Sequence, residues 1–288
     1  MMAGDAPLPP PGVRQQTVAR WRGGQASPQA QLQADWLAEE VPVALVFNGI
    51  SHAVMLASPA DLEDFALGFA FTEGLVTGPE ELLDTELVAV DQGLELRLQV
   101  TAACAWRLKD RRRQLAGRTG CGLCGTESLQ QVQRELPPVP VAHLSPTALA
   151  RAQLALRQHQ AVAGLTGASH AAAWCSAQGE VLCLREDIGR HNALDKLVGA
   201  RLRQGATAGP AAEPGFIAIT SRASFEMVQK AVFAGASALA AVSAPTSLAV
   251  DTARAAGLPL AGFVRGDDFV AYAFPERLGL PPLPSSVG

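Results

Sequence analysis

The second half of the chain alternates short apolar runs with segments of helical length, and this rhythm limits the possible folds more than any other feature. The runs Phe216 to Thr220, Leu239 to Val242 and Leu260 to Val264 have the length of buried strands. Strand, helix, strand spacing of this kind predicts parallel strands with helices covering the sheet. We also expect a hairpin from His170 to Arg185 and an edge strand from Asp268 to Phe274. The predicted class is therefore α/β, with a mixed sheet flanked by helices.

The first half predicts a smaller lobe of α+β type. Two apolar runs between Val41 and Ala57 flank Asn48-Gly49, which is a strong signal for a two-residue hairpin turn. Ser58, followed by Pro59, is expected to cap the helix that comes next. Apolar and polar residues then alternate from Leu94 to Val100, which predicts a half-buried strand.

Composition divides the chain into three parts. Residues 1–40 are rich in Pro, Gly, Gln and Ala without a sustained period, and we expect a mobile arm with a short strand near Val18 to Trp21. Residues 41–140 should form the N-terminal lobe, which carries a loop with two cysteines. Prolines at 137, 138 and 140 make a linker to a second domain at 141–288.

The bulk composition excludes several classes of protein. Hydrophobic residues make up 48% of the chain, which is typical of a globular protein, and the net charge of -4 with no basic stripe argues against a nucleic-acid-binding protein. The start of the chain lacks the apolar region of a secretory signal, and no apolar run is long enough to span a bilayer. We therefore expect a cytoplasmic protein without a membrane partner. Its five cysteines, an odd number, do not suggest a disulfide framework.

The segment Arg118 to Gly125 holds Cys121 and Cys124 among three glycines, so little side-chain bulk shields either sulfur. A thiol reacts as its thiolate, and Arg118 together with the start of a following helix would favour that form. These features predict sulfur chemistry on Cys121 or Cys124. A structural zinc site needs about four ligands, and no second pair is present, so we expect no metal. A redox pair of thioredoxin type stays open.

Polar clusters follow each of four expected strands in the second half. The carboxyl ends of parallel strands, where helices begin, are the usual ligand sites of open α/β sheets. Three of the four clusters contain an arginine, which suggests an anionic, phosphorylated ligand. The clusters are Glu186 to Asn192, Ser221 to Glu226, Ser243 to Ser247 and Arg265 to Asp268.

Helical geometry refines the first of these clusters. An apolar stripe of leucine and valine marks the inward face of the helix that starts near Arg190. At 100° per residue, His191 and Asp195 fall on this stripe. Asn192 and Lys196 should turn outward. The inward pair is a candidate for acid–base or orienting chemistry, and a hydrogen-bonded capping network at a helix start is the alternative.

Five ordered motifs together resemble the FdhD/NarQ family, the formate dehydrogenase accessory sulfurtransferases. The resemblance extends from about Pro42 to Leu278. The motifs are FTEGL from Phe71, TGCGLCG from Thr119, DIGRHNALDK from Asp187, SRASFEMVQKA from Ser221 and SAPTSLAV from Ser243.

The resemblance implies a particular chemistry. Family members are thought to receive sulfur from a cysteine desulfurase as a persulfide, which would fall on Cys121 with Cys124 as its partner. They then sulfurate the molybdenum bis(molybdopterin guanine dinucleotide) cofactor before it enters formate dehydrogenase. The resemblance also implies a C-terminal domain similar to the cytidine deaminase fold and a homodimer. Deaminase chemistry itself is not expected, because no His is followed two places later by Glu and Gly120 precedes Cys121.

The cofactor would bind as the acceptor of the sulfur, and no permanently bound cofactor is expected. The family's cofactor-contacting segment falls on Phe263, Val264, Arg265, Gly266, Asp267 and Asp268. The guanylyl phosphates would supply the anion for Arg190, Arg222 and Arg265, and His191 and Ser221 are also expected to bind the cofactor.

The sequence therefore predicts a sulfur carrier that passes sulfur from Cys121 to the bound cofactor. Two alternatives stay open. The chain could be a thiol–disulfide oxidoreductase that uses Cys121 and Cys124 as a redox pair, or a non-enzymatic chaperone that binds and delivers the molybdenum cofactor.

Overall fold

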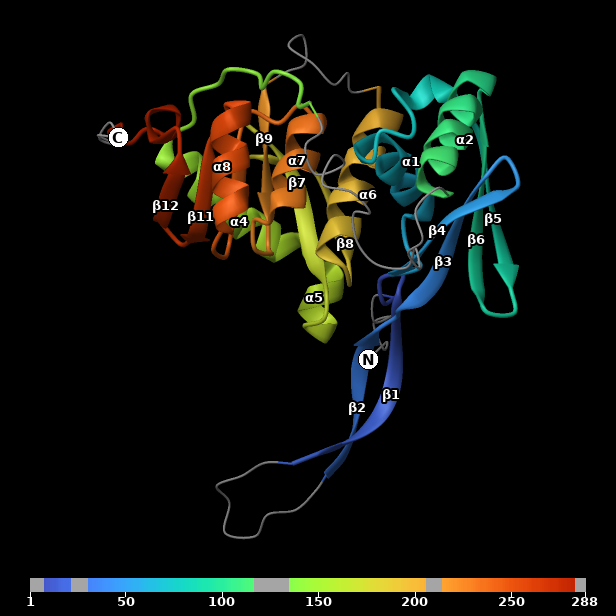
Figure 1. The fold of residues 1–288 in the computed structure, drawn as a ribbon. Helices are drawn as coiled ribbons and strands as arrows, with labels where there is room; N and C mark the ends of the chain where they lie inside the picture. Colours follow the sequence, from blue (N-terminus) through green and yellow to red (C-terminus); the bar gives the residue numbers. More distant parts are fainter. Residues whose placement is uncertain (1–7, 22–30, 117–134, 206–213, 283–288) are drawn as a thin grey trace.

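The computed structural model describes residues 8–21, 31–116, 135–205 and 214–282. Its described strands form three β-sheets (Figure 1). The largest has six strands in the order β12-β11-β10-β9-β7-β8. Its strands are β7 (His170–Ser176), β8 (Val181–Asp187), β9 (Gly215–Ile219), β10 (Leu239–Ala241), β11 (Leu260–Arg265) and β12 (Asp268–Ala273). Strands β9, β10 and β11 are parallel, whereas β7 and β12 run antiparallel to their neighbours. The predicted mixed sheet and its edge strand are confirmed.

Helices cover both faces of this sheet. Helix α4 (Pro146–His159) packs Leu149, Ala152 and Leu156 against one face. Ser145 caps it, accepting a hydrogen bond from the backbone N–H of Ala148 at 3.2 Å. Helices α6 (Arg190–Arg203), α7 (Phe225–Phe233) and α8 (Ser247–Ala256) cover the opposite face, and the short α5 (Ala161–Thr166) follows α4.

A four-stranded sheet in the order β4-β3-β6-β5 forms the other half of the fold. Its strands are β3 (Val41–Phe47), β4 (Ile50–Ala57), β5 (Leu82–Val90) and β6 (Gly93–Val100), and the described helices of this half are α1 (Leu62–Thr72) and α2 (Ala102–Ala116). Asn48 and Gly49 join β3 to β4 with φ angles of 44° and 79°, which is the geometry of the predicted hairpin turn. Short 3-10 helices, η1 (Pro79–Glu81) and η2 (Pro275–Leu278), complete the described elements.

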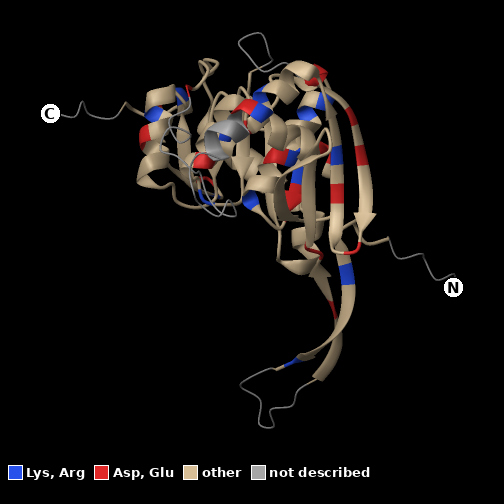
Figure 2. Cartoon of the chain, turned by 45° about the vertical axis from the view of Figure 1, so that its right-hand side comes forward, with Lys and Arg blue, Asp and Glu red and all other residues tan. Residues whose placement is uncertain are grey.

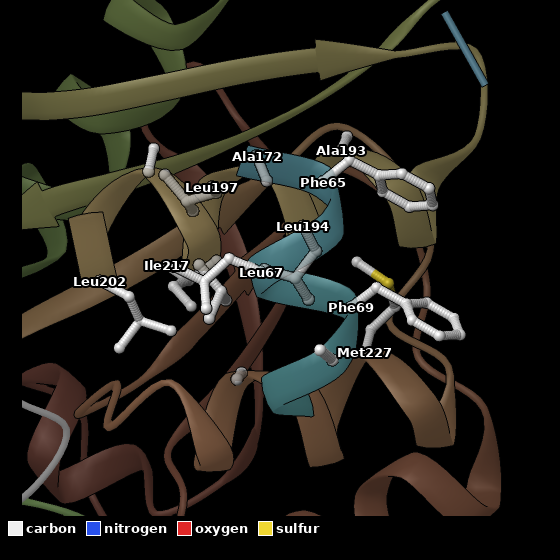
Figure 3. Packing of buried hydrophobic residues seen from close by; sticks show 14 of the residues in the cluster. Phe65, Leu67, Phe69, Ala172, Ala193, Leu194, Leu197, Leu202, Ile217 and Met227 are labelled. Atoms are coloured by element: carbon white, nitrogen blue, oxygen red, sulfur yellow. The ribbon is translucent and has the colours of Figure 1, made fainter. Parts of the chain in front are cut away.

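Helix α1 joins the two halves by packing directly on α6 (Figure 3). The two helices approach most closely at Gly68 and Gly199. A Cβ atom on Gly68 would lie 1.7 Å from the backbone oxygen of Asp195, and one on Gly199 would lie 1.8 Å from that of Asp64. One hydrophobic cluster consequently runs from the four-stranded sheet through α1 and α6 to the six-stranded sheet.

Helix α1 begins later than the sequence predicted. Ser58 was expected to be its N-cap, but the helix starts at Leu62 and Asp61 holds the N-cap position in the left-handed region, with φ of 54°. Ser58 is buried and donates its backbone N–H and its hydroxyl to the carboxylate of Asp187, at 2.9 and 3.1 Å. The hydroxyl therefore serves a contact with the second half of the chain instead of the start of α1.

Strands β1 (Val13–Arg20) and β2 (Gln31–Ala38) form a two-stranded antiparallel ribbon that extends away from the rest of the protein (Figure 1). The sequence predicted only a short strand here. Most side chains of the ribbon are exposed on both faces, so no alternation of apolar and polar residues marks it. Acidic and basic residues are interspersed along the described part of the chain (Figure 2). No helix in the described part of the chain is long and apolar enough to cross a membrane.

Candidate functional site

The predicted polar clusters do meet at one edge of the six-stranded sheet. Parallel strands β9, β10 and β11 end there, and β8, which is antiparallel to β7, ends there too. Adjacent strands lie about 4.8 Å apart, so the end of β11 is about 14 Å from β7, three strands away. The edge can therefore receive an elongated ligand.

Arg190 and His191 open helix α6 at this edge. Nε2 of His191 lies 2.8 Å from Oε2 of Glu226, the second residue of α7, but makes no hydrogen bond of good geometry. Glu226 is half exposed, and its pKa is lowered by the contact with His191 and the positive charge of Arg190. The predicted pairing of His191 with Asp195 is wrong, because each side chain has a partner on another helix.

His170, which the sequence analysis did not select, belongs to the same edge. It opens β7 and lies opposite Asp187 in the antiparallel register, which brings it to the end of β8. Burial lowers its pKa, with further lowering by the nearby charges of Arg190 and His191. The available sequence signal was a histidine at the first position of β7, because β7 pairs with β8, the strand before α6.

Ser221 and Arg222 follow β9 at this edge. Ser221 is buried and donates its hydroxyl to the backbone oxygen of Arg222 at 3.0 Å, whereas the Arg222 side chain is exposed. Ser224 occupies the N-cap position of α7, but its hydroxyl makes no cap hydrogen bond. Its Oγ atom is buried and has no hydrogen-bond partner in the described structure.

The segment Phe263 to Asp268 spans the end of β11 and the turn into β12. Phe263 is exposed and adopts the left-handed region with φ of 53°, at an irregularity in the pairing of β11 with β12. The guanidinium of Arg265 lies 5.8 Å from the centre of the Phe263 ring and donates to the backbone oxygen of Val242 at 3.2 Å. Gly266, Asp267 and Asp268 are exposed, while Val264 is buried in the sheet. An exposed ring beside a guanidinium offers a flat surface on which a base can stack.

Other polar residues of the DIGRHNALDK run are part of the scaffold. Asn192 and Lys196 were expected to turn outward, and both are buried. Lys196 is fully buried and pairs with Asp187 at 2.7 Å, while it donates to the hydroxyl of Ser58 at 2.7 Å. Asn192 donates to Asp187 at 3.0 Å and to the backbone oxygen of Leu56 at 2.7 Å. The prediction failed because α6 packs against the sheet on one side and against the first half of the chain on the other.

A second buried network contains Lys230, which the sequence analysis missed. Lys230 donates to both carboxylate oxygens of Asp195, at 2.9 and 3.0 Å, and to the hydroxyl of Thr72 at 2.9 Å. Burial raises the pKa of Asp195, whereas the Asp195 and Glu73 carboxylates raise that of Lys230 against the opposing effect of burial. The available sequence signal was a lysine within the mostly apolar segment that forms α7. This network ties α7 and α6 to the end of α1.

The cysteines fall into two groups. Cys121 and Cys124 lie outside the described residues. Cys104, Cys175 and Cys183 are buried. Cys104 lies on α2 and donates its thiol to the backbone oxygen of Leu75 at 3.1 Å. Burial raises the pKa of Cys175 to about 12, so this thiol stays protonated.

Taken together, the fold and this edge define a mixed α/β protein with a cluster of cationic side chains where its strands end. The sequence profile of the FdhD/NarQ family matches residues 38–279, and the chain belongs to that family.

Two similar proteins, both called sulfur carrier protein FdhD, match almost the whole chain. The one from Variovorax paradoxus (strain S110) is 58% identical over 283 residues, which cover 98% of this chain and 99% of that protein. The one from Bordetella petrii is 53% identical over 268 residues, with coverage of 92% and 94%. A crystal structure described as a formate dehydrogenase accessory protein from Desulfotalea psychrophila has a TM-score of 0.72 at 22% identity, covers 93% of this chain and 100% of that one, and shows the same fold.

Proposed function

We propose that this chain is a sulfur carrier that holds sulfur as a persulfide on Cys121 and passes it to the molybdenum bis(molybdopterin guanine dinucleotide) cofactor of a formate dehydrogenase. The observation that carries the proposal is the similarity to proteins called sulfur carriers, at 58% identity over 98% of the chain. The second support is a pair of cysteines among glycines at 121 and 124, because sulfur transfer needs a thiol that a partner can reach.

Loading of the carrier is a thiol exchange with a cysteine desulfurase. The Cys121 thiolate attacks the outer sulfur of the donor's persulfide, a new S–S bond forms on Cys121, and the donor cysteine leaves as a thiolate. In the transfer, the acceptor supplies the electron pair for a new bond to the outer sulfur, the S–S bond breaks, and Cys121 leaves as a thiolate. In this scheme Cys124 relays the sulfur or resolves the intermediate. The reaction is a group transfer, so the chain acts as a sulfurtransferase.

The acceptor is a substrate and not a resident cofactor. Its guanine would stack on Phe263 beside Arg265, at the end of β11, and its phosphates would extend along the edge toward Ser221, Arg222 and Arg190. Two features of the described residues support this assignment. The exposed aromatic ring suits a base. Arginine side chains at strand ends suit phosphate.

We further propose that the chain works as a homodimer in the cytoplasm. An isolated two-stranded ribbon is only marginally stable in water, and β1 and β2 extend away from the rest of the protein (Figure 1). A second copy that covers this ribbon would stabilise it. Light scattering should then give twice the mass of the 30.0 kDa chain.

The test of the sulfur carrier is a Cys121→Ala variant incubated with a cysteine desulfurase and cysteine. Intact-mass analysis should show one added sulfur atom on the wild-type chain and none on the variant. Cys175→Ala is the matched control, since its thiol is buried and protonated, and it should load as the wild type does.

Full loading of Cys121→Ala would contradict the assignment. A Cys121–Cys124 disulfide that exchanges with thioredoxin, without a persulfide, would instead indicate an oxidoreductase. Activation of the dehydrogenase by a chain lacking both cysteines would indicate a delivery chaperone.

A further inference from the structure

Four ionisable side chains meet where β8 ends and β7 begins, and only one of them is acidic. Arg190 and His191 come from α6 and His170 comes from β7. Glu226 comes from α7 and contacts His191. Two acidic groups beside these four have partners elsewhere: Asp187 pairs with Lys196, and Glu186 accepts the hydroxyl of Ser169 at 2.7 Å and two backbone N–H groups of α5.

Several polar atoms of this cluster are buried without satisfying a hydrogen bond. Nε of Arg190 and Oγ of Ser224 have no partner among the described residues, and Nε2 of His191 has only its contact with Glu226. Buried donors and acceptors are normally paired, so each such atom in a native protein needs an explanation. A ligand that accepts hydrogen bonds from the arginine and the imidazole would supply one.

Helices α6 and α7 add backbone donors to the same place. The N-cap of α6 is Gly189, which has no side chain, and the N-cap of α7 is Ser224, whose hydroxyl makes no cap bond. The first N–H groups of both helices therefore have no side-chain acceptor among the described residues, and the positive end of each helix dipole faces this edge. These donors act together with the side chains, which come from separate elements.

We propose that Arg190, His170 and His191 bind a phosphoryl group of the ligand, and that Glu226 is a counter-anion which this group displaces from His191. This inference rests on the proposed function, in which the acceptor carries guanylyl phosphates. It adds His170 and Glu226 to the site, and Glu226 is assigned the role of competing with the phosphoryl group for His191.

Glu226 suits displacement for two reasons. Its side chain is 54% exposed, so it can turn into solvent without leaving a buried charge. An exposed ion pair contributes at most about 1 kcal/mol, whereas a phosphoryl group offers several charged oxygens to the same donors. His191 would therefore exchange a weak partner for a stronger one when the ligand arrives.

The experiment is a calorimetric titration of the full chain with inorganic pyrophosphate. Arg190→Gln should weaken binding at least about tenfold, as expected for loss of a charged hydrogen bond of about 1.5–3 kcal/mol. Glu226→Gln should tighten binding by up to about fivefold, which corresponds to the weak ion pair that the ligand must otherwise break. Glu180→Gln is the matched control, because this carboxylate is 56% exposed, pairs with Arg151, and lies at the opposite edge of the sheet. It should leave the affinity unchanged.

A further variant separates displacement from the simple removal of a negative charge. If Glu226 acts by occupying His191, the gain from Glu226→Gln should vanish when His191→Gln is already present. An equal gain in both backgrounds would overturn the displacement, and unchanged binding by Arg190→Gln would overturn the site. Pyrophosphate binding needs no cysteine, so a failure of persulfide loading would refute the proposed function and leave this test standing.

Discussion

A single methyl group at Gly199 tests the contact that joins the two halves of the protein. In Gly199→Ala the new Cβ would lie 1.8 Å from the backbone oxygen of Asp64 on α1. Carbon and oxygen atoms in contact sit about 3.3 Å or more apart, so the two helices would have to separate by about 1.5 Å. A gap of about 0.5–1 Å already forfeits a quarter to a half of a dispersion contact. The packing of Phe65 and Leu194 in this interface (Figure 3) would therefore loosen.

The net effect combines two opposed terms. Overpacking in a core costs about 1–3 kcal/mol and occasionally more, and the directness of this clash favours the upper end. Alanine is more favourable than glycine in a helix by about 0.5–1 kcal/mol, which offsets part of the cost. We expect a net loss of about 2 kcal/mol in the free energy of unfolding, which corresponds to a fall of about 3 °C in Tm for a chain of this size.

Differential scanning calorimetry and urea denaturation measure this loss. Gly164→Ala is the matched control, since Gly164 also lies in a helix, α5, and a Cβ there would meet nothing within 4 Å. Its Tm should stay the same or rise slightly. If Gly199→Ala were as stable as the control, α1 and α6 could not be in the close contact described, and the argument that they share one core would be wrong.

Three further predictions concern buried ionisable groups. Lys230→Met should lower the free energy of unfolding in urea by about 3–5 kcal/mol, because it leaves the Asp195 carboxylate buried without a counter-charge, and adding Asp195→Asn should recover part of the loss. Burial lowers the pKa of His170, so the unfolded chain binds its proton at a higher pH than the folded protein. The free energy of unfolding should therefore fall as the pH drops below about 6.5. Denaturation measured above and below that pH should show a smaller fall for His170→Asn than for the wild type. Because burial raises the pKa of Cys175 to about 12, iodoacetamide at mildly alkaline pH should label it only after unfolding, which peptide mass mapping can show.

The sequence predicted the parts of the fold that depend on local patterns. Apolar runs separated by helical lengths gave the parallel strands β9, β10 and β11, and Asn48-Gly49 gave a hairpin turn with the expected positive φ angles. Strand β5 was missed. Leu83 and Leu87 on this edge strand are half exposed or more, so no period-two pattern separates a buried face from a solvated one.

The sequence predicted which strand ends share one edge of the sheet, but not the contacts that their polar residues make. Polar residues at four strand ends do reach one edge, because the direction of parallel strands settles where their ends lie. The partners of Lys196 and Asp195 could not be predicted, since Ser58 and Thr72 are 138 and 123 residues away in the chain. A helical period distinguishes an inner face from an outer one only when a helix has one buried side. Helix α6 is buried on two.

The order of residues in the DIGRHNALDK run explains how one segment serves both the scaffold and the site. Asp187 and Asn192 are buried and bind backbone groups from the first half of the chain, so they hold the backbone on both sides of Arg190 and His191. Fixing a side chain on binding costs about 0.5–1.5 kcal/mol, and a backbone that is already held adds nothing to that cost. Arg190 and His191 are partly exposed, and the buried residues around them keep the start of α6 in one place. Buried polar residues in this run thus stabilise the position of the partly exposed ones, which is a reason for placing scaffold and binding residues next to each other in a single stretch of chain.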